Sequence, residues 1–416
     1  MSPKSNPSNP SPLAPKSFPR MPAVPGVTLA AGACGLHKRG RSDLMLAETA
    51  SGTTVAGVFT RSLTASAPVQ WCRKALAGGQ ARGLVVNAAN ANAFTGAHGM
   101  EAVERTVEAV ADQLACRPSK IFAASTGVIG EPLSYEKIIG ALPGLKAELS
   151  PNAWEAAAKA IMTTDTFPKG ATRTAAIGGV EVTINGIAKG SGMIAPDMAT
   201  MLAFAFTDAT LPAPVLQALL ADAVDRSFNR ITVDSDTSTS DSVLLFATGA
   251  GGEHRPIEDA ADGGLDDFRA ALSALTLDLA HQVVRDGEGA SRFIAVTVTG
   301  AETDAAARRI AFAIANSPLV KTAVAGADAN WGRIIMAVGK AGEKVAPEKL
   351  SVAIGGVPVA RGGGAVPGYA ETPVARHMKG DEIAIDVDVG VGGGRATVWT
   401  CDLTHGYIEI NADYRT

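Results

Sequence analysis

Short apolar segments alternate with amphipathic stretches through most of this 416-residue sequence. The segments Gly83–Asn87 and 121–124 are short, uninterrupted apolar runs of the kind that form buried strands. Between them, residues 101–114 carry apolar side chains three or four positions apart, which is the spacing of one helix face. Strand, helix and strand in this order are typical of an α/β fold.

The same alternation continues to the C-terminus. Asn152 is a candidate N-terminal cap for one of the predicted helices. Further strands are predicted at 180–188, 200–206, 352–354 and 383–389, and further helices at 154–162, 214–228, 268–283 and 303–316.

Composition limits the kind of core that such a chain can build. Hydrophobic residues make up 46% of the sequence but aromatic residues only 5%, and there are 45 glycines. We therefore expect a core of Ala, Val, Ile and Leu joined by many tight turns. A chain of this length is too long for one ordinary core, which predicts two domains or two closely packed lobes.

Charge excludes several classes of function. Lys and Arg number 37 against 41 Asp and Glu, for a net charge of −4, so no basic surplus is present to neutralise nucleic-acid phosphates. The sequence contains no Walker-type phosphate loop and no G-x-G-x-x-G fingerprint, which argues against a nucleotide-driven enzyme. A small charged metabolite fits this composition.

The N-terminal 26 residues are rich in Pro, Ser and Asn and are predicted to be a disordered or loosely tethered tail. They lack the apolar region of a secretory signal, and no later stretch is long and apolar enough to span a bilayer. The four scattered cysteines are expected to be reduced thiols, which together with these features predicts a cytoplasmic protein.

No metal is predicted. The six histidines show no ligand spacing. By count alone Asp234, Asp236 and Asp241 resemble a cation site, but their setting among Ser and Thr fits a hydrogen-bonded loop better.

The most informative stretch runs from Lys189 to Leu202 and reads Lys-Gly-Ser-Gly-Met-Ile-Ala-Pro-Asp-Met-Ala-Thr-Met-Leu. A glycine-rich turn leads through a proline to Thr200, at the mouth of an apolar strand. A β-branched threonine suits a strand without any chemical role. Its position alone therefore does not identify a nucleophile.

This stretch resembles the self-cleavage segment of the ornithine acetyltransferase (glutamate N-acetyltransferase) family of arginine biosynthesis. The similarity covers nearly everything after the tail. The chain departs from the family pattern at 87–94, where the family carries Ser-Gly and Cys, and in the length of its tail. Further matching segments follow in the family's order at 90–93, 125–130, 162–166, 228–241, 286–290, 328–333 and 411–416.

The resemblance implies a two-lobed α/β sandwich, cut between Ala199 and Thr200 into an α chain (27–199) and a β chain (200–416) that stay associated as α2β2. Thr200 Oγ would attack the carbonyl of Ala199, and hydrolysis of the resulting ester would leave Thr200 as a new N-terminus. Its α-amine, with an intrinsic pKa of roughly 8, then serves as general base for its own hydroxyl. This nucleophile needs no histidine.

The implied reaction is a ping-pong transfer of acetyl from N-acetylornithine to glutamate through acetyl-Thr200. It uses no cofactor, and the partners are the small-molecule substrates and the other chain, without nucleic acid or membrane. Some family members also take acetyl from acetyl-CoA, so a monofunctional and a bifunctional enzyme both remain open.

Thr126 and Gly127, at the end of a predicted strand, match the family's oxyanion-hole pair of one hydroxyl and one backbone N–H. Without the resemblance, the same two residues describe an ordinary strand-to-loop turn. Attack on an acetyl carbonyl creates an oxyanion, and a single preorganised donor for it is worth roughly 3 to 4 kcal/mol.

The substrate contacts also follow the matching motifs. Lys189 is placed to hold a carboxylate and Glu288 to accept hydrogen bonds from an ammonium group, although isolated charges of this kind usually face solvent. One of Thr163 and Thr164 is expected to contact substrate, and both stay candidates. The predicted set is Thr163, Thr164, Lys189, Thr200, Glu288, Asn411 and Thr416.

Two alternatives belong to other classes. One is an N-terminal-nucleophile aminopeptidase or amidase of similar fold, in which water replaces glutamate. The other is a processed amino-acid-binding protein in which Thr200 is inert. Glu288, Asn411 and Thr416 favour the transferase because they supply amino-acid recognition.

Overall fold

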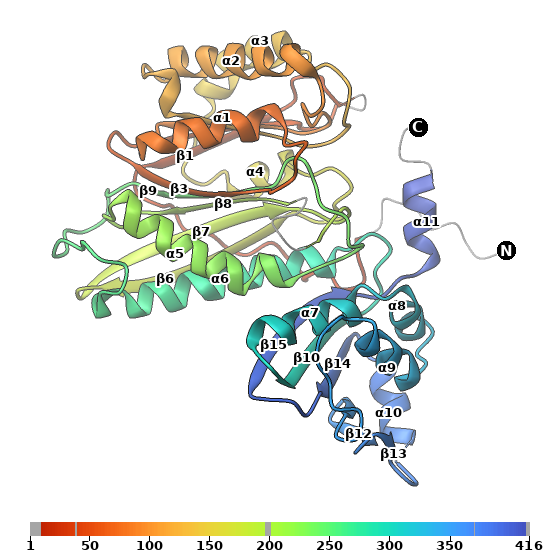
Figure 1. The fold of residues 1–416 in the computed structure, drawn as a ribbon. Coiled ribbons are helices and arrows are strands. Elements are labelled where there is room, and N and C mark those ends of the chain that lie inside the picture. Colours follow the sequence, from red (N-terminus) through yellow and green to blue (C-terminus); the bar gives the residue numbers. More distant parts are fainter. Residues whose placement is uncertain (1–9, 38–39, 196–200, 370, 413–416) are drawn as a thin grey trace. The chain divides into compact units, whose positions relative to one another are not determined.

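The computed structural model describes residues 10–37, 40–195, 201–369 and 371–412, which form two compact units (Figure 1). The first, here called the N-terminal unit, comprises Pro15–Asn229 and Asp236–Val283. The second, the C-terminal unit, comprises Met1–Ala14, Arg230–Ser235 and Val284–Thr416. Packing therefore does not divide the chain at the predicted boundary between residues 199 and 200.

Two sheets form the centre of the N-terminal unit. A four-stranded sheet has the order β1-β2-β4-β5 and a five-stranded sheet the order β3-β9-β8-β7-β6. The strands are β1 (Val27–Gly32), β2 (Leu44–Thr49), β3 (Thr54–Phe59), β4 (Gly83–Asn87), β5 (Ile121–Ser125), β6 (Lys169–Ile177), β7 (Val180–Lys189), β8 (Leu202–Thr207) and β9 (Ser242–Ala247).

Strand register brings the ends of the five-stranded sheet into one row. The parallel strands β8 and β9 begin level with each other, Leu202 opposite Ser242. The antiparallel strand β7 ends opposite the start of β8, Lys189 beside Leu202, and β3 ends opposite the start of β9. One end of this sheet therefore holds the last residues of β3 and β7 and the first residues of β8 and β9.

The core between the two sheets is aromatic at its centre, unlike the wholly aliphatic core expected from composition. The rings of Phe206 and Phe246 stack at 4.9 Å, and Phe122 meets Phe246 edge-on at 6.0 Å. Trp154 of α4 (Trp154–Ala160) packs edge-on against Phe206 at 5.7 Å. These four rings thus meet at one place, where each buries a large area.

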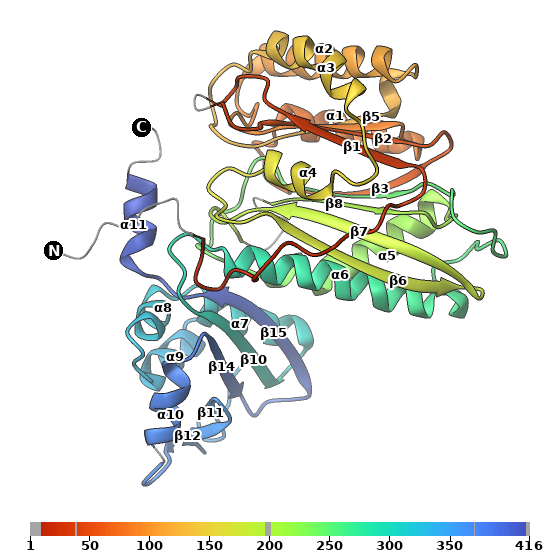
Figure 2. The ribbon, with the colours of Figure 1, turned by 180° about the vertical axis from the view of Figure 1, so that it is seen from behind.

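Helices cover the outer faces of both sheets (Figures 1 and 2). The helices α2 (Gly96–Gln113) and α3 (Tyr135–Ala147) lie over the four-stranded sheet, and α5 (Ala213–Arg226) and α6 (Asp266–Arg285) over the five-stranded one. The N-terminal unit is an α/β/β/α sandwich, which confirms the predicted α/β class. Its remaining helical elements are α1 (Ala67–Ala75) and the short 3-10 turns η1 (Leu76–Gly78), η2 (Pro118–Lys120), η3 (Phe228–Arg230) and η4 (Gly263–Leu265).

The C-terminal unit is built on a six-stranded sheet of order β13-β12-β11-β14-β10-β15. The helices α7 and α9 bury apolar side chains against one face of this sheet. The strands are β10 (Phe293–Ala301), β11 (Ser351–Ile354), β12 (Val357–Arg361), β13 (Gly364–Ala365), β14 (Glu382–Asp388) and β15 (Gly394–Cys401). The helices are α7 (Asp304–Ala315), α8 (Pro318–Ala325), α9 (Trp331–Gly339), α10 (Glu371–Met378) and α11 (His405–Ala412).

Most predicted elements are present, with ends that shift by a few residues. The predicted helix at 101–114 begins earlier, at Gly96, and the helix predicted from Trp154 ends at Ala160. The predicted cap of this last helix is wrong: Ala153 occupies the cap position, so Asn152 lies one residue too early to accept from its first amides. Within the described ranges, no helix combines the length and apolarity needed to cross a bilayer.

The tail prediction is wrong for the part of the tail nearest the fold. Met21 and Val24 are buried in the core between the two sheets, with Phe18 packed against them. Asn185 Nδ2 donates to Pro22 O at 2.7 Å and Thr248 Oγ1 donates to Pro25 O at 2.7 Å. A few apolar residues among the prolines anchor this segment. The prediction missed them because it used the average composition of the whole tail.

Candidate active site

The predicted oxyanion-hole pair lies at the carboxyl end of β5. Because β4 and β5 are parallel, Asn87 and Ser125 end level with each other, and Thr126 N donates to Asn87 O at 3.0 Å. The Thr126 hydroxyl and the Gly127 N–H have no hydrogen-bond partner among the described residues. Thr126 is 5% exposed, so the strand end presents two unused donors in a largely buried position.

Gly127 cannot carry a side chain here. Its φ is +131°, and a Cβ would lie 2.2 Å from the carbonyl carbon of Ala89. The loop 87–94 presses against it, since Val128 N donates to Ala89 O at 3.1 Å and Ala91 N to Val128 O at 2.9 Å. Glycine lets the loop approach this closely, whereas any side chain would displace it.

The loop 87–94 is itself held in an unusual backbone conformation. Ala89, Asn92 and Phe94 have φ values of 75°, 46° and 56°. The side chains of Asn87 and Asn90 secure the loop by donating to Asn90 O at 2.9 Å and Glu131 O at 3.0 Å. This is the segment that departs from the family pattern, and its asparagines hold it beside Thr126 and Gly127.

A buried charge cluster lies beside the end of β7. Asp165 Oδ1 accepts from Lys169 Nζ at 2.6 Å and from Gly190 N at 2.7 Å. Asp165 Oδ2 accepts from Thr163 N at 3.0 Å and lies 3.9 Å from Lys189 Nζ. One carboxylate thus fixes two predicted substrate contacts and the glycine-rich turn.

Electrostatics keeps this carboxylate ionised. Burial alone would raise the pKa of Asp165, but the ammonium groups of Lys169 and Lys189 and the Gly190 N–H together hold it below its ordinary value. The sequence did not single out Asp165 or Lys169, although Asp165 lies inside the matched segment 162–166. An aspartate that directly follows two threonines carries no signal until the fold buries it beside a lysine.

The two candidate threonines differ in what their hydroxyls do. Thr164 Oγ1 shares a hydrogen bond of 2.7 Å with Ser191 Oγ. The Thr163 hydroxyl has no partner among the described residues, and its carbonyl accepts from Arg41 at 3.3 Å. Thr163 is therefore the threonine with a donor available to a ligand.

Backbone hydrogen bonds connect the loop 87–94 to the segment that precedes β9. Ala67 N donates to Asn92 O at 3.1 Å, and its neighbour Ser66 N donates to Thr239 O at 2.8 Å. Two residues further on, Asp241 Oδ1 accepts from Met201 N at 2.8 Å. The loop 87–94 and the start of β8 therefore lie at the same end of the sandwich.

In the C-terminal unit, two of the predicted substrate contacts meet. Asn411 Nδ2 donates to Glu288 Oε2 at 2.7 Å, although 123 residues separate them. Glu288 is 7% exposed, in the turn that follows α6. A Cβ on Gly289 would lie 2.5 Å from Tyr407 N, so glycine lets α11 approach this turn closely. This hydrogen bond ties the end of α11 to the turn at Glu288.

Three predicted positions fall outside the described residues, namely Ala199, Thr200 and Thr416. β8 begins two residues after Thr200, at Leu202. Strand β8 lies between β7 and β9 in the middle of the sheet, so hydrogen bonds tie the residues after position 200 to those before it.

The two fully buried cysteines are poor nucleophiles. Burial raises the pKa of the Cys72 thiol to about 12 and that of Cys401 to about 11, which disfavours a thiolate nucleophile. No three His, Cys, Asp or Glu side chains gather as a metal site in the part of the chain that the structure describes. In the predicted Asp-rich loop, Ser238 and Asp241 are engaged by hydrogen bonds from Thr60.

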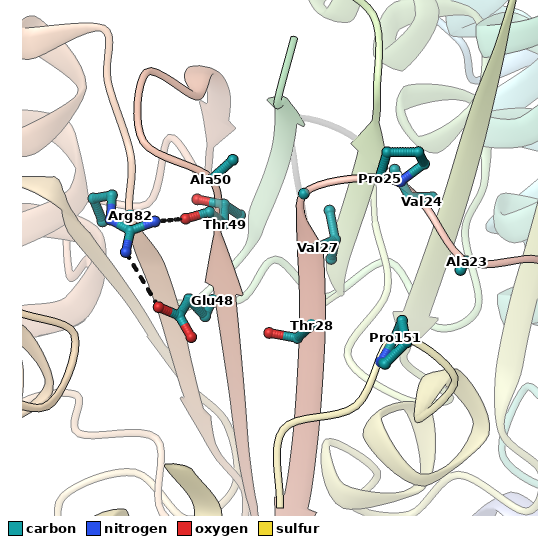
Figure 3. A pocket seen from close by; sticks show the side chains of 11 residues that line it. Ala23, Val24, Pro25, Val27, Thr28, Glu48, Thr49, Ala50, Arg82 and Pro151 are labelled. Atoms are coloured by element: carbon teal, nitrogen blue, oxygen red, sulfur yellow. Dashed lines mark hydrogen bonds and ion pairs between the residues drawn. The ribbon is translucent and has the colours of Figure 1, made fainter. Parts of the chain in front are cut away.

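A pocket of about 450 Å³ opens at the other end of the four-stranded sheet (Figure 3). It lies beside Val27 and Arg82, where β1 and β4 begin, whereas Thr126 follows the carboxyl end of β5. Its charged side chains already pair, with Arg82 Nη2 3.1 Å and Lys146 Nζ 2.6 Å from Glu48. This pocket is not the candidate site.

Comparisons with known proteins agree with the motifs. The profile of the ArgJ family matches residues 28–416. The arginine biosynthesis bifunctional protein ArgJ of Gluconobacter oxydans is 57% identical over 94% of this chain and 92% of its own length, and that of Rhizobium meliloti is 58% identical over 94% and 95%. A crystal structure of the arginine biosynthesis bifunctional protein argJ from Bacillus halodurans is 41% identical, covers 49% of this chain and 95% of that chain, and has a TM-score of 0.47.

Proposed function

Since the chain belongs to the ArgJ family, we propose that it transfers acetyl from N-acetylornithine to glutamate in arginine biosynthesis. Relatives more than half identical in sequence carry the name of a bifunctional arginine-biosynthesis protein. The second activity we assign is acetyl transfer from acetyl-CoA to glutamate. The acetyl-CoA acts as a substrate, and the reaction needs no bound cofactor.

The observation that carries this proposal is the pair of unused donors at the end of β5. Acetyl transfer passes through tetrahedral intermediates whose oxygen bears a negative charge. The Thr126 hydroxyl and the Gly127 N–H are held close together with their hydrogens uncommitted among the described residues. A fixed pair of donors stabilises that charge without the cost of reorganising a flexible loop.

The nucleophile we propose is Thr200, formed by self-cleavage. Thr200 Oγ–H adds to the Ala199 carbonyl carbon, the C–N bond breaks, and the nitrogen takes up the proton. Water then hydrolyses the ester, which leaves a carboxylate on Ala199 and a free α-amine on Thr200. The central place of β8 in its sheet supports chains that stay associated after the cut.

Acetyl transfer repeats the same chemistry on a ligand. Thr200 Oγ attacks the acetyl carbonyl, its proton passes by way of the α-amine to the leaving ornithine nitrogen, and acetyl-Thr200 remains. The amine of glutamate then attacks this ester and leaves as N-acetylglutamate, returning the proton to Thr200. Both substrates use one pocket in turn.

Lys189 and Thr163 are the groups of the N-terminal unit that we assign to substrate binding. Lys189 is 3% exposed, and Asp165 and the turn at Gly190 fix its surroundings, so its ammonium is preorganised for a carboxylate. Thr163 is preferred to Thr164 because only the Thr164 hydroxyl is already bonded, to Ser191.

Replacing Thr163 with valine is expected to raise KM for N-acetylornithine and for glutamate about tenfold, which is the loss of one hydrogen bond. Steady-state kinetics of the cleaved protein would measure it. Thr164→Val, the matched control, breaks the bond to Ser191 and should lower the melting temperature while leaving both KM values within about threefold. The opposite pattern would assign the contact to Thr164.

Glu288→Gln removes a charge but keeps the side chain's size and its ability to accept from Asn411. We expect a loss of about 1.5 to 3 kcal/mol of charge-assisted bonding to the substrate ammonium, or about tenfold to 150-fold in kcat/KM for both substrates. Self-cleavage involves no ligand and should persist.

The control for that variant is Glu382→Gln, at an exposed glutamate of the same unit that pairs with Arg285. Steady-state kinetics of both cleaved proteins with N-acetylornithine and glutamate test whether Glu288 binds the substrate. Parental constants in Glu288→Gln would make Glu288 an ordinary turn residue.

The assembly we propose is an α2β2 heterotetramer in the cytoplasm. The test of the whole proposal is incubation of the purified protein with N-acetylornithine and glutamate, followed by mass spectrometry. A transferase yields N-acetylglutamate and ornithine, an amidase yields acetate, and a binding protein leaves both ligands intact. Family membership at this identity favours the transferase over the aminopeptidase alternative.

A further inference from the structure

Asp241 is a buried carboxyl group that the proposed reaction does not use. It directly precedes β9 and is 0% exposed. Its backbone is fixed, because its carbonyl accepts from Thr60 N at 3.0 Å and the next residue, Ser242, donates to Met201 O at 3.2 Å. The side chain therefore projects from a rigid strand end.

Only one of its two carboxyl oxygens has a partner. Asp241 Oδ1 accepts from Met201 N at 2.8 Å. Asp241 Oδ2 is buried and has no hydrogen-bond partner in the described ranges. Buried polar atoms are nearly always paired, so an unpaired carboxyl oxygen on a rigid strand end calls for an explanation.

Burial and two neighbouring groups act on the pKa of this carboxyl. Burial raises its pKa well above the usual range, while the Met201 N–H and the positive charge of Lys189 act in the opposite direction. Asparagine has the same shape as aspartate, so it can occupy this position without changing the packing around it.

The hydrogen bond to Met201 N joins this carboxyl to the residue that directly follows the proposed nucleophile, Thr200. Met201 N is the nitrogen of the peptide bond from residue 200, so the α-carbon of residue 200 is two covalent bonds away from the atom that Asp241 holds. A cut before residue 200 creates a new amine on that same α-carbon.

We propose that Asp241 is a positioning residue for the nucleophile, with Oδ1 anchoring the amide of Met201 and Oδ2 accepting a hydrogen bond from the α-amino group that residue 200 gains on cleavage. The inference rests on the proposed function. The hydrogen bond to Oδ2 turns the amine's lone pair toward the Thr200 hydroxyl, from which it takes a proton. No bond to Asp241 is made or broken in the reaction.

Asp241→Asn separates the two roles. The amide oxygen still accepts from Met201 N, but the amide nitrogen that replaces Oδ2 can only donate. We expect the protein to be cut and to melt within about 2 °C of the parent. In the cleaved protein kcat should fall at least tenfold, with KM for N-acetylornithine and glutamate within about threefold.

The matched control is Asp208→Asn. Asp208 follows the far end of β8 and, like Asp241, accepts one backbone N–H, from Thr183 at 2.7 Å. Its kcat should equal that of the parent. An equal loss in Asp208→Asn, parental kcat in Asp241→Asn, or an Asp241→Asn chain that stays uncut would each overturn the proposal. A parent protein without acetyl transfer would instead refute the proposed function.

Discussion

Thr200→Ala is expected to remain one full-length chain and to lose acetyl transfer altogether. The threonine hydroxyl is both the atom that attacks the Ala199 carbonyl and the atom that carries acetyl, so its removal stops both reactions. Denaturing gels and intact-mass spectrometry should show fragments 1–199 and 200–416 for the parent and a single species for the variant.

Thr200→Ser is the matched control, because serine keeps the hydroxyl and loses only a methyl group. It should still be cut and should retain measurable turnover. Normal processing of Thr200→Ala would remove the basis of the mechanism, since no hydroxyl would then be needed at that position.

The sequence predicted the position of the turn at Thr126 and Gly127 better than it predicted the residues that hold the candidate site in place. Thr126 and Gly127 were placed correctly at the end of a strand because an apolar run followed by a glycine turn is a local pattern. The hydrogen bond between Asn411 and Glu288 is not local, and no pattern in the sequence predicted it. Motifs thus identified candidate residues without showing which of them are in contact.

Asp165 was not singled out from the sequence, and Asp241 was interpreted only as part of a hydrogen-bonded loop. Both are buried aspartates with backbone partners. Asp165 and Asp241 each accept from a main-chain amide next to a predicted functional residue, Gly190 and Met201 respectively. An aspartate destined for burial looks in sequence like a solvated one. Its hydrogen-bond partners distinguish it, and the register of the strands determines which partners it has.

The aromatic core and the anchored tail were missed for a related reason. Composition averages the whole chain, whereas Phe122, Phe206 and Phe246 meet in one place. Val24 is 1% exposed within a segment whose average composition resembles a disordered linker. One well-placed apolar residue can fix such a segment against a sheet.

Removing the Thr126 hydroxyl is expected to have the largest effect among the groups that do not react covalently. Thr126→Ala deletes one of two oxyanion donors, which should lower kcat by about 100-fold to 1000-fold, or roughly 3 to 4 kcal/mol. Both half-reactions pass through a tetrahedral intermediate, so release of ornithine and formation of N-acetylglutamate should slow together.

The fold should survive that change. The hydroxyl has no partner among the described residues, so its loss leaves no buried polar group without a hydrogen bond. Thr126→Ser keeps the donor and should retain most of the turnover. Rapid-quench measurement of acetyl-enzyme formation and breakdown, with circular dichroism melting of each variant, separates a catalytic loss from a structural one. Turnover of Thr126→Ala within about threefold of the parent would show that the strand end is only a turn, and that the negative charge is stabilised elsewhere.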